Sequence, residues 1–276
     1  KLNIIKFGYN MIPKELLVLG IVIPLKSVAT SSCWASTSQS LIATLKSVLN
    51  QTSNNYRVIV VGHEAPLKLD ELGAKESIFY SISKELPPPP PVNATQEQFT
   101  FDKNSKISKG IELLRQRYSD ITLWFALDAD DLIEESLVEI VLEALPFSLF
   151  SLDCGYMYYA QAKRVIETRE LSQYCGSTAI VHNDYLLFDE NGVLISCPFL
   201  TQSHMGISHY FKQLPDTKVK TTSLPLVMYS LGHGENISDG YRNWFQKMLA
   251  TLKPYLKGSG VSTELAKSFG IDKDTF

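Results

Sequence analysis

Three carboxylates stand close together directly after an apolar run near the middle of the chain. The run ends at Leu127 and is followed by Asp128, Asp130 and Asp131. A run of this kind is usually buried, and a buried charge is costly unless it is paired or bound to a metal. Carboxylate oxygens suit Mg²⁺ or Mn²⁺, which typically takes one or two carboxylates together with substrate phosphates. The first hypothesis is therefore a divalent ion that holds a phosphorylated substrate.

The elements that would position these acids are indicated by apolar spacing. Runs rich in Leu, Val and Ile are typical of buried parallel strands, and apolar residues three and four apart indicate amphipathic helices. The expected strands are Leu16–Pro24, Arg57–Val61, Ile78–Ile82, the run that ends at Asp128, one long or two short strands over Tyr156–Ile166, and Ser177–Val181. The expected helices are residues 41–49 with an N-cap within Ser36–Ser38, 107–118, 134–142 opened by Glu134 and Glu135, and a final helix after Gly240.

This alternation of strands and helices predicts an α/β fold with parallel strands. Three strand ends, at Pro24, Glu64 and Asp128, should then lie on one edge of the sheet. In an open α/β sheet, ligands collect beyond the carboxyl ends of the strands. We therefore expect a nucleotide at this edge.

A proline-rich loop and three lysines precede the acidic motif. Pro87–Pro91 lie within the expected loop Glu85–Thr100 and favour an extended connector. Lys103, Lys106 and Lys109 follow it. Lysine is a compact point charge that suits phosphate, although a solvated helix face is the alternative reading for any one of them.

Length and composition leave room for one large domain or two small ones. The chain has 276 residues, of which 45% are hydrophobic, and a net charge of −3 that gives no general indication of nucleic-acid binding. Its four cysteines are far apart and form no CxxC pair, so we expect reduced thiols in a cytosolic protein. The longest apolar stretch, Leu16–Leu25, is too short to span a bilayer and lacks a signal-peptide pattern.

The order and spacing of five segments resemble a family 2 glycosyltransferase of the GT-A fold. These segments are Ile21-Val22-Ile23-Pro24, residues 40–51, residues 56–61, residues 106–110 and Phe125-Ala126-Leu127-Asp128-Ala129-Asp130-Asp131. The resemblance covers about Leu19–Glu139 well and the remainder loosely. It implies a single GT-A domain over residues 1–276, with a Rossmann-like, mostly parallel central sheet flanked by helices. A nucleotide-sugar-binding half at about 15–132 would precede a mixed acceptor-side half and C-terminal helix at about 133–276.

The same resemblance implies an activity. It is the metal-dependent transfer of a sugar, of the hexosyltransferase type, from a nucleotide-diphosphate donor to a hydroxyl of a glycan or lipid-linked acceptor in polysaccharide biosynthesis. A UDP-sugar is the expected donor and Mn²⁺ or Mg²⁺ the expected cofactor. The implied location is cytoplasmic, either free or peripherally associated with the inner face of the membrane, and no nucleic-acid partner is expected.

The resemblance also implies roles for individual residues. Pro24 and Leu25 would border the base or ribose, and Glu64 would recognise the base. Residues beside the nucleotide would be Lys103, Lys106 and Gly110. Asp128 would approach the ribose or the metal, and Asp130 and His233 would ligate the metal. His233 has an even alternative as a loop histidine satisfied by backbone groups. The usual Asp-Gly-Ser is His63-Glu64-Ala65 here, which leaves the nucleotide base open.

The catalytic base is not marked by a motif, because the Glu-Asp pair usual in the second half of inverting members is absent. The candidates for the base or an acceptor contact are His204, Asp131 and Asp184, with Asp189 as a further choice, and each has an ordinary loop or surface residue as its alternative. Residues Tyr174–Thr178 are a candidate acceptor wall.

Three other readings compete with a glycosyltransferase. A haloacid dehalogenase-type phosphatase would need its Asp-x-Asp motif near the start of the chain and Thr or Val where Leu132 stands. A sugar nucleotidyltransferase would need a glycine-rich, arginine-bearing loop after the first strand. A catalytically inactive protein that keeps the fold and binds glycans or nucleotides is favoured by the missing Glu-Asp pair.

Overall fold

The computed structural model describes residues 17–72, 78–82, 85–231 and 253–271. Among them, a central sheet of seven strands has the order β12-β6-β9-β4-β1-β2-β3. The strands are β1 (Val18–Pro24), β2 (Tyr56–Gly62), β3 (Ile78–Ile82), β4 (Ile121–Ala126), β6 (Leu149–Ser151), β9 (Ala179–His182) and β12 (Val219–Thr221). β9 is antiparallel to both its neighbours, and the other pairs are parallel. The expected Rossmann-like, mostly parallel α/β sheet is therefore confirmed.

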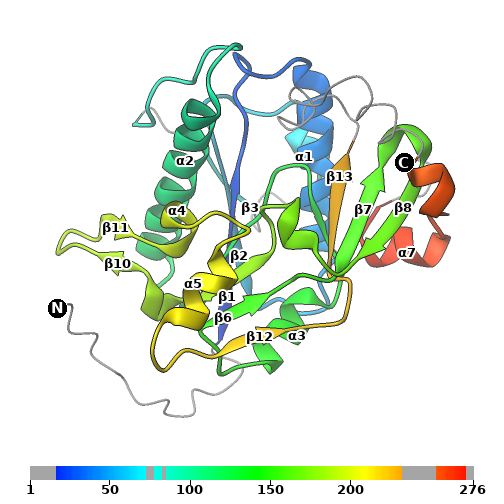
Figure 1. Cartoon of the computed structure of the whole chain (residues 1–276). Coiled ribbons are helices and arrows are strands. Elements are labelled where there is room, and N and C mark those ends of the chain that lie inside the picture. Colours follow the sequence, from blue (N-terminus) through cyan, green and yellow to red (C-terminus); the bar gives the residue numbers. More distant parts are fainter. Residues whose placement is uncertain (1–16, 73–77, 83–84, 232–252, 272–276) are drawn as a thin grey trace.

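A second sheet stands beside the central one (Figure 1) and has the order β14-β8-β7-β13-β5. Its strands are β5 (Leu132–Ile133), β7 (Gly155–Tyr159), β8 (Arg164–Thr168), β13 (Val227–Leu231) and β14 (Ser259–Gly260). β7 and β8 form an antiparallel hairpin, so the two-strand alternative for Tyr156–Ile166 is correct. A separate hairpin of β10 (Leu187–Phe188) and β11 (Leu194–Ser196) projects from the body of the molecule.

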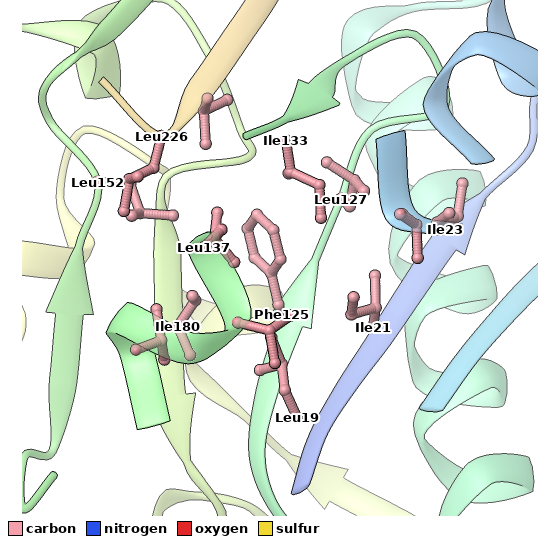
Figure 2. Close-up of a cluster of buried hydrophobic side chains, with 14 of the residues drawn as sticks. Leu19, Ile21, Ile23, Phe125, Leu127, Ile133, Leu137, Leu152, Ile180 and Leu226 are labelled. Atoms are coloured by element: carbon pink, nitrogen blue, oxygen red, sulfur yellow. The ribbon is translucent and has the colours of Figure 1, made fainter. Parts of the chain in front are cut away.

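Helices cover both faces of the central sheet, which explains why β1 is apolar throughout. They are α1 (Trp34–Leu49), α2 (Gln96–Arg117), α3 (Leu137–Glu143), α4 (Pro198–Thr201) and α5 (Ile207–Gln213). The further helix α7 (Thr263–Ser268) packs against the second sheet. Leu19, Ile21 and Ile23 of β1 share one core cluster with α1 and α3 (Figure 2). Val18 and Val22 face the other way, into a cluster with α2 and α5. Side chains alternate across a strand, so a strand buried on both faces carries no polar positions.

Several helix boundaries differ from those expected. α1 begins at Trp34 with Cys33 as its N-cap, and no side chain caps it, so Ser36–Ser38 lie inside the helix. α2 begins at Gln96, inside the expected loop, because Thr95 and Gln98 form a reciprocal capping box.

The acidic residues expected to open α3 precede it instead. α3 begins at Leu137, and the Glu134 carboxylate accepts hydrogen bonds from the backbone N–H (2.7 Å) and hydroxyl (2.5 Å) of Ser136. The helix expected after Gly240 lies in residues 232–252, outside the described part of the chain. No helix within the described residues is long and apolar enough to cross a membrane.

Gly110 holds α2 close to the sheet, which corrects its expected place beside a nucleotide. A Cβ added to Gly110 would lie 2.4 Å from Cγ1 of Val22 and 3.2 Å from Cγ2 of Val61. Both valines are buried between α2 and strands β1 and β2. The glycine is needed for helix packing, and its position leaves no room for a ligand.

Replacing Gly110 by valine is expected to lower the free energy of unfolding by about 2 kcal/mol or more, because the added side chain overpacks a filled core. Urea denaturation followed by circular dichroism measures this. Gly260→Val is the matched control, because a Cβ there meets no atom within 4 Å, and it should change stability by less than about 0.5 kcal/mol. Equal stability of the two variants would contradict the close packing of α2.

Candidate functional site at the end of strand β4

The acidic residues form a tight turn that links the two sheets. The backbone N–H of Asp131 donates to the carbonyl of Asp128 at 3.1 Å, and β5 then starts at Leu132 and pairs with β13 of the second sheet. Strands β1, β2 and β4 are parallel neighbours, so their carboxyl ends lie on one edge as expected. Asp128 and Asp130 remain partly exposed at this edge, whereas Asp131 is buried.

Asp128 is paired with a lysine from α2. Nζ of Lys103 lies 2.5 Å from Oδ1 of Asp128, and the two side chains are 40% and 25% exposed. Gly176 borders both, since a Cβ added there would lie 3.0 Å from Asp128 Oδ2 and 3.0 Å from Lys103 Nζ. A cation that binds Asp128 must therefore share the carboxylate with Lys103 or displace it.

Asp131 faces inward and joins three segments. Its carboxylate accepts hydrogen bonds from Oγ of Ser177 (2.6 Å), Sγ of Cys175 (3.1 Å) and the backbone N–H of Ser230 (3.4 Å). Burial, together with the neighbouring Asp130 and Asp128 carboxylates, raises the pKa of Asp131 well above its usual value. Asp131 was expected as a base or acceptor contact, but its side chain has no exposed surface for such a contact. Its position suits a role in fastening the acidic turn.

Cys175 and Ser177 hold the other side of this connection. Burial and the Asp131 carboxylate raise the pKa of the Cys175 thiol well above its usual value, so it donates a hydrogen bond as a neutral thiol. Ser177 also accepts a hydrogen bond from the backbone N–H of Asp128 at 2.9 Å. Residues 175–177 thus hold the acidic turn in place through hydrogen bonds, although they had been expected to form part of an acceptor wall.

Glu64 and Lys106 lie at the same edge, next to each other. Glu64 follows β2 and accepts a hydrogen bond from the backbone N–H of Val28 at 3.0 Å, which ties the loop after β1 to the end of β2. Lys106 is 1% exposed and lies 2.6 Å from Asp102. Burial lowers the pKa of Lys106, and Asp102 and Glu64 act in the opposite direction. The ammonium group has almost no surface left for a phosphate.

Pro24 and Leu25 do not border an open site. Both are buried, and Leu25 has no exposed surface and belongs to the core under α1. The backbone N–H of Leu25 donates to the carbonyl of Val61 at 2.8 Å, which continues the pairing of β1 with β2. The expected contact of these side chains with a base or ribose is therefore wrong for this conformation.

Two further candidates lie away from the acidic turn. β9 runs antiparallel to β4, so Asp184, which follows β9, lies at the amino end of β4 and beside His182 at 3.3 Å. His204 is hydrogen-bonded through Nδ1 to the carbonyl of Ser172 at 2.6 Å, in the short helix η4 (Leu171–Gln173). His233 lies outside the described residues. The structure therefore brings neither Asp184 nor a described histidine onto the acidic turn.

The donor set at the turn fits a metal only if a substrate supplies the remaining ligands. Within the described residues, no three His, Cys, Asp or Glu side chains are arranged to hold a metal ion. Asp128 and Asp130 offer two carboxylates at an exposed edge. This is the number that Mg²⁺ uses when phosphate oxygens and water complete its shell. The chemistry fits a cation shared with a diphosphate.

Comparison with known proteins gives limited similarity. No family model matches the sequence, and no curated protein matches it. Among solved structures, HddC from Yersinia pseudotuberculosis complexed with GMP-PN has a TM-score of 0.40 and 9% identity, over 80% of this chain and 96% of that one. The inositol-1-phosphate CTP transferase from T. maritima has a TM-score of 0.36 and 9% identity, over 86% of this chain and 96% of that one. The glycosyltransferase GlyE of Streptococcus pneumoniae has a TM-score of 0.37 and 8% identity, over 88% of this chain and 65% of that one. These scores are low, and the proposals below rest on the residues of this chain.

Proposed function

We propose that this protein transfers a sugar from a nucleotide-diphosphate donor, expected to be a UDP-sugar, to a hydroxyl group of a glycan or lipid-linked acceptor. The observation that supports this most is the convergence of Asp128, Asp130 and Lys103 at the shared carboxyl edge of β1, β2 and β4. Two carboxylates beside an ammonium group suit a cation and a phosphate held side by side. The family 2 resemblance described above implies the same activity.

Asp128 and Asp130 would hold Mn²⁺ or Mg²⁺ together with the donor diphosphate. When bound there, the metal neutralises charge that develops on the leaving nucleoside diphosphate. The Lys103 ammonium group contacts Asp128, and its side chain is 40% exposed. When the donor binds, the Lys103 ammonium group would move from the Asp128 carboxylate to a phosphate oxygen of the donor. The same lysine would then pair with Asp128 before donor binding and with the phosphate after it.

The transfer step exchanges two bonds at the anomeric carbon of the sugar. The acceptor hydroxyl oxygen forms a bond to this carbon while the bond from the carbon to the diphosphate oxygen breaks. The electron pair leaves with the nucleoside diphosphate, and the hydroxyl proton passes to a carboxylate or to water. Asp131 and Ser177 keep the acidic turn in place during this step, since they join it to β9 and β13.

A non-catalytic protein that binds nucleotides or glycans on the same fold is the second candidate. It is favoured by one observation, which is that neither Asp131 nor Asp184 offers a base at the turn. The enzyme and a nucleotide-binding protein both require a nucleotide at the edge of the sheet, whereas a purely glycan-binding protein does not. Mn²⁺-dependent hydrolysis of UDP-sugars separates them, because only the enzyme turns the donor over.

Nucleotide binding is tested by thermal shift with UDP, Mn²⁺ and both together. Because Lys103 already neutralises Asp128, Mn²⁺ alone is expected to give little shift. UDP with Mn²⁺ should stabilise the fold by about 2.7 kcal/mol when present at a hundredfold excess over its dissociation constant. AMP with Mn²⁺ is the control that lacks a diphosphate. A shift by Mn²⁺ alone that UDP does not increase would contradict a shared cation.

A further inference from the structure

A polar groove opens near the acidic turn, and none of its lining residues is among those proposed above to bind the donor. It lies at the base of the β7–β8 hairpin and has a volume of about 540 Å³. Its lining comes from the second residue before β7, the two residues after β8, and η4 with the residue that follows it: Asp153, Arg169, Glu170, Ser172, Gln173 and Tyr174. From these residues, we propose that the groove binds the carbohydrate acceptor.

Hydrogen bonds of backbone and side chains join the segments that line the groove. Asp153 accepts hydrogen bonds from the backbone N–H of Leu171 (2.9 Å) and, through Oδ1, from that of Ser172 (3.3 Å). His204 binds the carbonyl of Ser172 on the other side. Cys175 N–H donates to Leu171 at 3.0 Å. A site fixed in this way loses little conformational entropy when a ligand binds.

The groove adjoins the proposed donor site through a short length of chain. Tyr174 lines the groove, and Gly176, two residues later, borders the Asp128–Lys103 pair. Two residues span at most about 7 Å, even when fully extended. An acceptor in the groove would therefore place a hydroxyl group within reach of a sugar held at Asp128.

The lining indicates the class of ligand. The Tyr174 side chain is 45% exposed and offers an aromatic face, and Nζ of Lys253 lies 6.0 Å from its ring centre. Two carboxylates and one guanidinium group line the rest. The Lys253 ammonium group beside Tyr174 balances the second carboxylate, so the net charge is close to zero and a polyanion or polycation gains little. Hydroxyl groups accept and donate hydrogen bonds to such side chains, and an aromatic face packs on an apolar sugar face. The lining therefore fits a hydroxyl-rich sugar.

This inference rests on the proposed function, so its test separates the two. Binding of a panel of methyl hexosides at millimolar concentration is measured by saturation-transfer NMR on the full chain without donor. We expect at least one glycoside to bind. Tyr174→Ala should weaken that binding by about three- to tenfold, because the variant lacks the aromatic face on which a sugar would pack. Tyr174→Phe keeps the ring and should bind like the unsubstituted protein.

A second, independent test replaces a carboxylate of the groove and, as its control, a carboxylate outside the groove. Glu170→Gln should weaken glycoside binding several-fold, and Glu190→Gln, an exposed residue of the β10–β11 turn, should leave it unchanged. UDP-dependent stabilisation with Mn²⁺ should be the same in all variants. Absence of any glycoside binding, or equal binding by Tyr174→Ala and the unsubstituted protein, would overturn the groove assignment. If UDP with Mn²⁺ does not stabilise the unsubstituted protein, the proposed function is overturned instead.

Discussion

Replacing Asp130 by alanine is expected to lower kcat/KM for sugar transfer by about a hundredfold or more, with little loss of stability. Asp130 is partly exposed in the turn that follows β4, where it would share a cation with the donor diphosphate. Removing one group that stabilises charge in a transition state typically costs about a hundred- to a thousandfold in rate. The measurement is Mn²⁺-dependent release of UDP from UDP-sugars, together with the melting temperature of each variant.

Asp120→Ala is the matched control for this prediction. Asp120 lies just before the other end of β4 and is 42% exposed beside Arg57, so its removal takes the same charge from the opposite edge of the sheet. It should keep full activity and stay within about 0.5 kcal/mol in stability. An Asp130→Ala enzyme that retains metal-dependent turnover would show that the cation does not bind there.

Replacing Asp131 by alanine is expected to destabilise the fold by about 3 kcal/mol or more. The change leaves the Ser177 hydroxyl, the Cys175 thiol and the Ser230 N–H without their acceptor, and each buried unsatisfied group typically costs about 1–3 kcal/mol. The loss is measured by urea denaturation. Asp131→Asn retains one carbonyl oxygen and should recover part of the stability.

Activity of Asp131→Asn distinguishes a positioning residue from a catalytic base. If Asp131 only fastens the turn, the asparagine variant keeps measurable transfer with an unchanged pH profile. If Asp131 took the acceptor proton, the variant would lose turnover while remaining folded. Unchanged stability of Asp131→Ala would contradict the three hydrogen bonds at its carboxylate.

The apolar pattern predicted the central sheet because a strand that is buried on both faces is a continuous run of apolar residues. β1, β2 and β4 appear where continuous Val, Ile and Leu runs indicate them, and the shared edge of their carboxyl ends follows from parallel pairing. Helix starts were less predictable, since they depend on individual capping contacts. The capping box of Thr95 and Gln98 lay inside a segment that its prolines marked as a loop.

The partners of the acidic residues depend on pairings that lie far apart in the sequence. Ser177 and Cys175 reach Asp131 because β9 pairs with β4, about fifty residues away along the chain. A strand at Ser177–Val181 was expected, but no local signal indicates its neighbour. The roles expected for Gly110 and Leu25 failed for a related reason. Their spacing matched a motif, while their burial depends on how α1 and α2 pack on the sheet.

Cation binding at the acidic turn is tested most directly by a crystal soaked with Mn²⁺ and UDP, with anomalous scattering recorded for manganese. The account predicts one manganese peak at coordination distance from Asp128 and Asp130, with UDP phosphate oxygens on the same ion and Nζ of Lys103 turned from Asp128 to a phosphate. An intact Lys103–Asp128 pair in a crystal that binds UDP, with no manganese at the turn, would contradict it.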